Sequence, residues 1–212
     1  KNFAMYRTRR VSDLDGTPFD LVLADYQGQK LSQLVIDPPK RFFGPRGARE
    51  INALIFVVDL FRELRGAGGE ASGDDVLLEH YSQNADAQIR ERVEEQCRYI
   101  NEYTLEIILE TTFSKREMCS IFLVVNKIDL LRVLVERGCI EGVMPSAIHS
   151  YVSELYAPLN GLIKEAVRAN GVERSFGAYL ISARTGENLA TVFSEIISRY
   201  QASVERSSGE RS

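Results

Sequence analysis

Two short apolar runs place the strongest constraint on how this chain folds. Residues Ile51 to Asp59 and Ile121 to Val125 are largely apolar without alternation, a pattern typical of strands that are buried on both faces. Ala178 to Ile181 predicts another strand further along the chain. Such strands need helices on both faces of their sheet, so the sequence predicts an α/β fold with a mostly parallel sheet.

Between and after these runs, apolar residues recur at three- and four-residue steps, which is typical of helices with one buried face. Ile89 to Thr111 predicts one long amphipathic helix, and Ile148 to Val167 predicts a second that is bent at Pro158. Leu189 to Ile197 predicts a closing helix with Asn188 at its cap.

The first part of the chain predicts an antiparallel hairpin. Phe3 to Arg9 and Phe19 to Asp25 are strand-like, and the Asp15-Gly16 pair between them favours a turn. We expect this hairpin at one edge of the parallel sheet. The glycine-rich segment from Arg65 to Asp75 has no apolar anchor and predicts a flexible insertion.

The composition, with 44% apolar and 26% charged residues, is that of a folded globular protein and excludes a disordered chain. The length of 212 residues suits one domain, predicted over residues 1–202. The polar residues 203–212 predict a disordered tail. No run approaches the roughly 18 apolar residues of a membrane span, so we expect no integral membrane segment.

Net charge and cysteine content indicate which partners and which cellular compartment to expect. With a net charge of −4 the chain gives no reason to expect a nucleic-acid partner. Cys97, Cys119 and Cys139 are odd in number and lack metal-ligand spacing, which disfavours a disulfide framework and a zinc site. These features predict a cytoplasmic protein.

Polar residues follow three predicted strands, where ligands bind in sheets of this kind. The segments are Asp25 to Gln29, Asn126 to Asp129 and Ser182 to Asn188. Asp129 offers paired acceptors for a base that carries a ring N–H and an exocyclic amine, and a backbone N–H of the last segment suits a carbonyl on the same base. Each segment alone also fits an ordinary strand exit or helix entry.

Taken in this order, D-x-x-G, N-K-x-D and S-A resemble the nucleotide-binding motifs of the G domain of Ras-like and Gα-like GTPases, within the P-loop NTPase superfamily. The resemblance covers nearly the whole chain. It implies that Asp25 holds a magnesium ion through a water and that the Gly28 N–H contacts the γ-phosphate of GTP. Gln29 would orient the attacking water. The segment after Gly28 would be a switch that binds effector or regulatory proteins.

For the base, the resemblance implies that Asn126 and Asp129 read guanine and that the stem of Lys127 packs over the ring. Ser182 and the Ala183 N–H would complete recognition at the base carbonyl. Adenine lacks that carbonyl and the exocyclic amine, and it would leave Asp129 without its partners. The bound ligands would be GTP or GDP with Mg²⁺.

One element of the family pattern is missing. None of the six lysines is followed by Ser or Thr, so the chain contains no G-x-x-x-x-G-K-[ST] phosphate loop. We expect this loop in an upstream segment of roughly 30 or more residues, the size of one β-α unit. With it, the protein would be a switch that hydrolyses GTP slowly, and this chain alone would be a weak or inactive GTPase. Without it, the protein would be a pseudo-GTPase that serves as a protein-interaction module.

Overall fold

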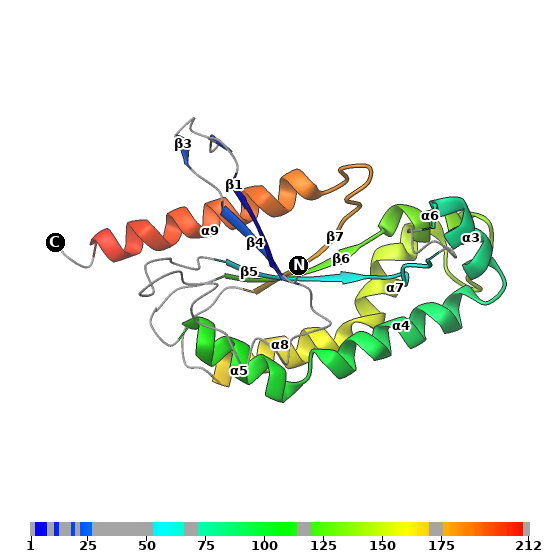
Figure 1. Ribbon diagram of the computed structural model, residues 1–212, viewed down its shortest axis with the longest axis horizontal. Helices are drawn as coiled ribbons and strands as arrows, with labels where there is room; N and C mark the ends of the chain where they lie inside the picture. The colour runs from blue at the N-terminus through cyan, green and yellow to red at the C-terminus, as the bar shows by residue number, and fades with distance from the viewer. Residues whose placement is uncertain are drawn as a thin grey trace.

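The computed structural model has an α/β architecture, built on a parallel sheet of three strands with helices on both faces (Figure 1). It describes residues 3–7, 11–12, 18–19, 22–26, 53–65, 72–113, 120–169 and 176–209. The strands are β5 (Ala53–Asp59), β6 (Ser120–Asn126) and β7 (Phe176–Leu180), in the order β5-β6-β7. The prediction of an α/β fold with parallel strands is confirmed.

The central strand β6 shows why these runs are apolar throughout. Ile121, Leu123 and Val125 are buried in the larger hydrophobic core. Phe122 and Val124, which alternate with them, belong to a second core. Because successive side chains of a strand point to opposite faces, a strand covered on both sides needs apolar residues at every position.

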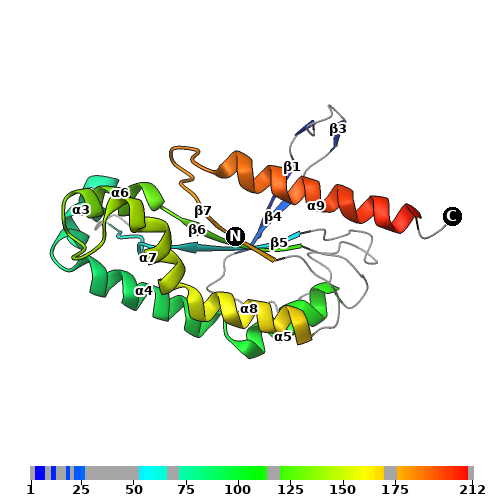
Figure 2. The same ribbon diagram turned by 180° about the vertical axis from the view of Figure 1, so that it is seen from behind.

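The two cores correspond to the two layers of helices. The helices are α3 (Asp74–Ser82), α4 (Ala85–Tyr99), α5 (Glu102–Phe113), α6 (Ile128–Glu136), α7 (Ile148–Leu155), α8 (Ala157–Ala169) and α9 (Leu189–Gly209), with a 3₁₀ turn η3 (Pro145–Ala147) before α7. Figures 1 and 2 show α9 on one face of the sheet and α4, α5 and α8 on the other. The α9 side chains Val192 and Ile196 close the smaller core.

The predicted long helix from Ile89 to Thr111 is wrong, because the structure has two helices there. α4 ends at Tyr99, and α5 begins at Glu102. Asn101 starts the second helix, since its side-chain Oδ1 accepts the backbone N–H of Thr104 at 3.0 Å. The apolar pattern continues across the break because Ile100 remains buried in the core.

The sequence predicted one helix bent at Pro158, but the structure has two helices separated by a break at Tyr156, two residues earlier. α7 ends at Leu155 and α8 begins at Ala157, with Tyr156 between them. Pro158 therefore occupies the first turn of α8, where its missing N–H removes no intrahelical hydrogen bond.

The closing helix is longer than the sequence predicted. α9 runs to Gly209, so the backbone of residues 203–209 is helical where we expected a disordered tail. A helix that has already been nucleated gains one hydrogen bond for each residue added, and polar residues such as Glu205 and Arg206 are good helix formers. At the other end, the carbonyl of Asn188 accepts the N–H of Val192 at 3.1 Å, as a capping residue does.

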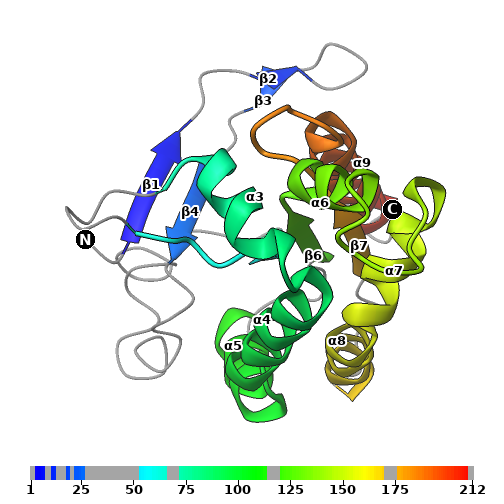
Figure 3. The ribbon, with the colours of Figure 1, turned by 90° about the vertical axis from the view of Figure 1, so that its right-hand side faces the viewer.

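The first part of the chain contributes short strands. β1 (Phe3–Arg7) and β4 (Val22–Tyr26) pair antiparallel, with Phe3 opposite Tyr26. β2 (Val11–Ser12) and β3 (Pro18–Phe19) form a second small pair. Figure 3 shows β1 and β4 side by side and apart from β6 and β7. Among the described residues no strand pairing joins them to β5, so the place of this hairpin at the sheet edge stays a prediction.

Candidate functional site

The carboxyl ends of the parallel strands bring the predicted base-reading residues together. Asp59 and Asn126 lie directly opposite each other as the last residues of β5 and β6. Beyond the end of β7, the Ile181 N–H donates to the Val125 carbonyl at 2.8 Å, which keeps the chain beside β6. The next residue but one is Ala183, which therefore reaches the side chain of Asn126.

The side-chain amide of Asn126 joins all three strand ends. Its Nδ2 donates to Asp59 Oδ1 at 2.9 Å, and its Oδ1 accepts the Ala183 N–H, also at 2.9 Å. Each of these contacts uses one end of the amide, so the orientation of the side chain is fixed. Asn126 therefore ties together the parts of the predicted base site.

Lys127 takes an unusual backbone conformation at the start of α6. Its φ of 72° lies in the left-handed region, which costs a non-glycine residue about 1 kcal/mol. The ammonium donates to the Phe61 carbonyl at 3.4 Å and lies 3.8 Å from Asp59 Oδ2. The charged end of Lys127 is thus held at the end of β5.

Asp129 lies in the first turn of α6, where a negative charge is favoured by the positive end of the helix dipole. Its side chain is half-buried. In the part of the chain that the structure describes, no hydrogen bond or ion pair engages its carboxylate. The role of this carboxylate as a paired acceptor for a base stays a prediction.

Ser182 builds the turn that carries Ala183. It is fully buried, and its Oγ accepts the Thr185 N–H at 3.1 Å. Its carbonyl accepts the Gly186 N–H at 3.0 Å. The hydroxyl is therefore engaged inside the loop, while Ala183 lies exposed beside it. The predicted roles of Ser182 and Ala183 in base recognition stay predictions.

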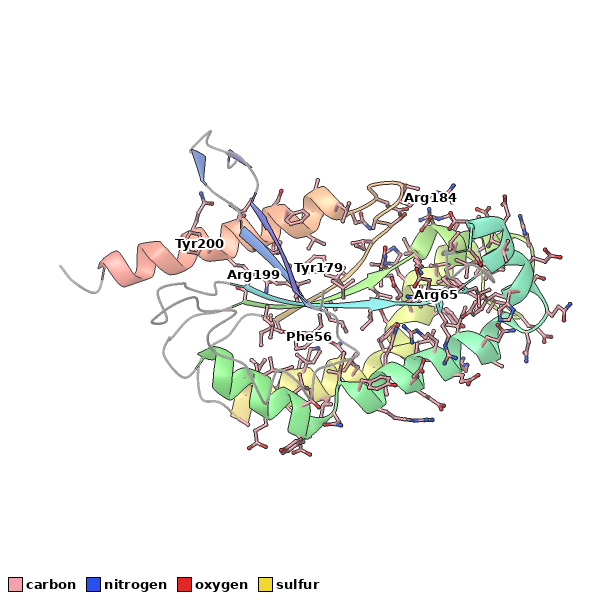
Figure 4. All side chains as sticks on the ribbon, viewed as in Figure 1. Phe56, Arg65, Tyr179, Arg184, Arg199 and Tyr200 are labelled. Atoms are coloured by element: carbon pink, nitrogen blue, oxygen red, sulfur yellow. The ribbon has the colours of Figure 1, made fainter. Side chains whose placement is uncertain are left out.

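Two ion pairs hold the same turn in place. Arg132 of α6 binds Glu187 through two hydrogen bonds of 3.0 and 2.7 Å. The hydrogen bonds from Arg132 hold the pKa of the Glu187 carboxyl below its usual value. Arg184, labelled in Figure 4, forms an ion pair with Asp74 at the start of α3. The turn is thereby fastened to α6 and to the segment between β5 and β6.

The predicted phosphate side is described only in part. Asp25 lies in β4, opposite Ala4 of β1. Gly28 and Gln29 lie outside the described residues, so their predicted roles stay predictions. The described residues gather no group of three or more His, Cys, Asp or Glu side chains suited to a metal ion. Magnesium at Asp25 is therefore still an expectation from the resemblance.

Asp59 is the residue that the sequence analysis missed. It is a polar residue that ends a buried strand, so the rule that selected Asp25 and Asn126 also selects Asp59. Its role is visible only in the structure, because its partner Asn126 is 67 residues further along the chain.

A cavity of about 290 Å³ lies beside β7. The polar residues that line it are His149, Ser153, Tyr156, Asn160, Tyr179, Asn188 and Thr191. None of the predicted site residues contributes to its wall.

Comparison with known proteins adds no assignment. No protein-family model matches the sequence, and no curated protein matches it either. Within the described ranges, every helix falls short of the length or the apolar character that crossing a membrane requires.

Proposed function

We propose that this chain is the base-binding part of a cytoplasmic guanine-nucleotide switch with the fold of a Ras-like or Gα-like G domain. One observation carries the proposal. Asp129, whose carboxylate has no hydrogen bond or ion pair among the described residues, lies three residues after Asn126, whose amide is fixed against Asp59 and Ala183. The arrangement combines a paired acceptor with a backbone donor, which is the complement of one edge of guanine.

Recognition would follow from this complementarity. The two oxygens of Asp129 accept the ring N–H and the exocyclic amine, and the Ala183 N–H meets the base carbonyl. That N–H already donates to Asn126 Oδ1, so a base carbonyl shares or replaces this bond. A base without these groups leaves Asp129 unpaired, and sites of this design reject such analogues by about 10⁴-fold.

Catalysis would belong to the phosphate side. Asp25 would hold Mg²⁺ through a water, the Gly28 N–H would contact the γ-phosphate, and Gln29 would position the attacking water. Most of the electrostatic stabilisation in such enzymes comes from the phosphate loop. Hydrolysis is therefore expected only when that loop is supplied, and effector or regulatory proteins would bind through the segment after Gly28.

A pseudo-GTPase that serves as a protein-interaction module is the second candidate. The chain lacks a G-x-x-x-x-G-K-[ST] motif, which favours this candidate. Both polar atoms of the Asn126 side chain are also already hydrogen-bonded within the protein, to Asp59 and Ala183. In that case the strand ends would form a rigid scaffold, and no nucleotide would be needed to hold them together.

Substitution of Asp129 by Asn separates these candidates. The asparagine presents a donor where the carboxylate presents an acceptor, so it matches xanthine better than guanine. We expect wild-type protein to prefer GDP over ADP and Asp129→Asn to prefer XDP over GDP by about 10-fold or more. The measurement is equilibrium binding of GDP, XDP and ADP to the full chain by titration calorimetry.

Glu136→Gln is the matched control, because it removes the same charge from an exposed position of the same helix. It should bind GDP like the wild type. If wild-type protein binds no guanine nucleotide at millimolar concentration, the switch proposal fails and the interaction module is favoured.

A further inference from the structure

Gln96 is a buried polar residue on the inner side of α4. The other buried residues of this helix, Ala85, Ile89 and Val93, are apolar and pack in the core. Gln96 is only 7% exposed, and both ends of its amide make hydrogen bonds of 2.7 Å. Its Nε2 donates to the main-chain carbonyl of Asp59, and its Oε1 accepts the hydroxyl of Tyr156.

These bonds continue into the candidate base site. Tyr156 OH donates to Gln96, and Gln96 donates to the carbonyl of Asp59. The carboxylate of the same Asp59 accepts the Asn126 amide, which in turn accepts the Ala183 N–H. The series runs from the junction of α7 and α8, through α4, to the ends of β5 and β6 and the turn after β7.

We propose that Gln96 is a positioning residue that sets the orientation of Asn126 by holding the end of β5. Gln96 fixes the carbonyl of Asp59, and rotation of that peptide would carry the Asp59 carboxylate away from the Asn126 amide. The consequence for nucleotide affinity rests on the proposed function. Gln96 is buried, and of the residues at the strand ends its side chain is bonded to Asp59, so its effect on Asn126 passes through Asp59.

Physical chemistry favours a specific role for this amide. An apolar side chain of similar length would fill the same space in α4 without needing partners, whereas a buried amide is tolerated only when its groups are paired. A fully paired polar network inside the core selects one arrangement of the elements that it joins. Burial also raises the pKa of Tyr156, so its hydroxyl remains a donor at neutral pH.

The position of Gln96 links the long segment between β5 and β6 to the base site. α4 lies wholly within that segment, and Tyr156 occupies the break between α7 and α8. A shift of α4 relative to β5 would therefore change the orientation of the Asn126 side-chain amide, and α4 would not need to contact the nucleotide.

The experiment compares amide NMR signals of the full chain without nucleotide. Gln96→Met removes both hydrogen bonds while keeping the length of the side chain. Gln96→Glu at neutral pH keeps an acceptor for Tyr156 and removes the donor to Asp59. Both variants should move the signals of the Ala183 amide and the Asn126 side chain, and both should weaken GDP binding by about 10-fold. Tyr156→Phe keeps the bond to Asp59 and should produce a smaller shift.

Val93→Ala is the control, since it weakens the core on the same helix but leaves the hydrogen-bonded series intact. It should lower stability without moving the Ala183 or Asn126 signals. The proposal is overturned if Gln96→Met and Gln96→Glu leave both signals where the wild type has them, or if Val93→Ala moves them equally. If the signals move as expected but wild-type protein binds no GDP, the positioning role stands and the proposed function fails.

Discussion

The two halves of the candidate site differ in how the fold supports them. The base half lies at the ends of β5, β6 and β7, where strand pairing and the side chains of Asn126 and Asp59 fix one arrangement. The phosphate half begins with Asp25 in β4, whose described pairing is with β1 alone. The base half is therefore fixed by contacts between strands that are 67 residues apart in the sequence, and the described part of the phosphate half by a local strand pair.

This difference shows where a parallel sheet gives precision. Asp59 and Asn126 meet because their strands are paired in register over their whole length, and helices cover both faces. Asn126 ends β6, which is hydrogen-bonded to β5 on one side and to β7 on the other, whereas the described pairing of β4 is with β1. Changes at the Asn126 amide should therefore affect folding and base binding together, whereas a change of Gln29 should affect the hydrolysis step alone.

The largest effect that separates the halves is expected at Gln29. Gln29→Leu removes the group predicted to orient water, so single-turnover GTP hydrolysis should slow by about 100-fold in protein supplied with a phosphate loop. GDP affinity should change by less than about 2-fold, since the residue is not predicted to contact the base. Rapid-quench assays with labelled GTP measure the rate. An unchanged rate removes Gln29 from the mechanism.

Asn126→Ala should lower the free energy of unfolding by about 2 kcal/mol, because it leaves the Asp59 carboxylate and the Ala183 N–H without these partners. It should also reduce binding of GDP. Urea unfolding followed by circular dichroism gives the stability, with Val57→Ala at an exposed position of β5 as the control. Equal losses in the two variants would show that the Asn126 amide does not hold the strand ends together.

A smaller effect is expected from the ion pair at the turn after β7. Arg132 lowers the pKa of Glu187 in the folded state, so this pair stabilises the fold above the ordinary glutamate pKa of 4.5. The contribution is lost as the pH falls through the lowered value. Glu187→Gln should cost about 0.5–1 kcal/mol near neutral pH and progressively less as the pH falls below 4.5, as measured by urea unfolding across this range. A cost that persists in acid would assign the effect to packing.

The sequence predicted the elements whose signals are local. The apolar runs predicted the strands β5, β6 and β7. The polar residues at and after the end of β6 predicted Asn126 and Asp129 as candidate site residues. It failed at Ile100 and Tyr156, where the helical spacing of core residues continues although the helix stops. Periodicity reports which residues face the core, and the caps that end a helix are a separate signal.

Long-range polar contacts could not be predicted in this way. Gln96 is one polar position in an amphipathic helix, and nothing near it in the sequence indicates that it reaches Asp59, 37 residues away. Ser182 matched a motif, yet its burial beneath the turn depends on how that turn folds back on itself. Such contacts follow from strand register and helix packing, which only the folded chain defines.

The most direct test of the central claim is a titration of the isotope-labelled full chain with GDP, followed by amide NMR, with ADP as the control. Base reading at the strand ends predicts GDP-dependent shifts centred on Asn126, Asp129 and Ala183, at millimolar ligand if the phosphate loop is lacking. Absence of shifts at these residues, or shifts confined to the cavity beside β7, would contradict it.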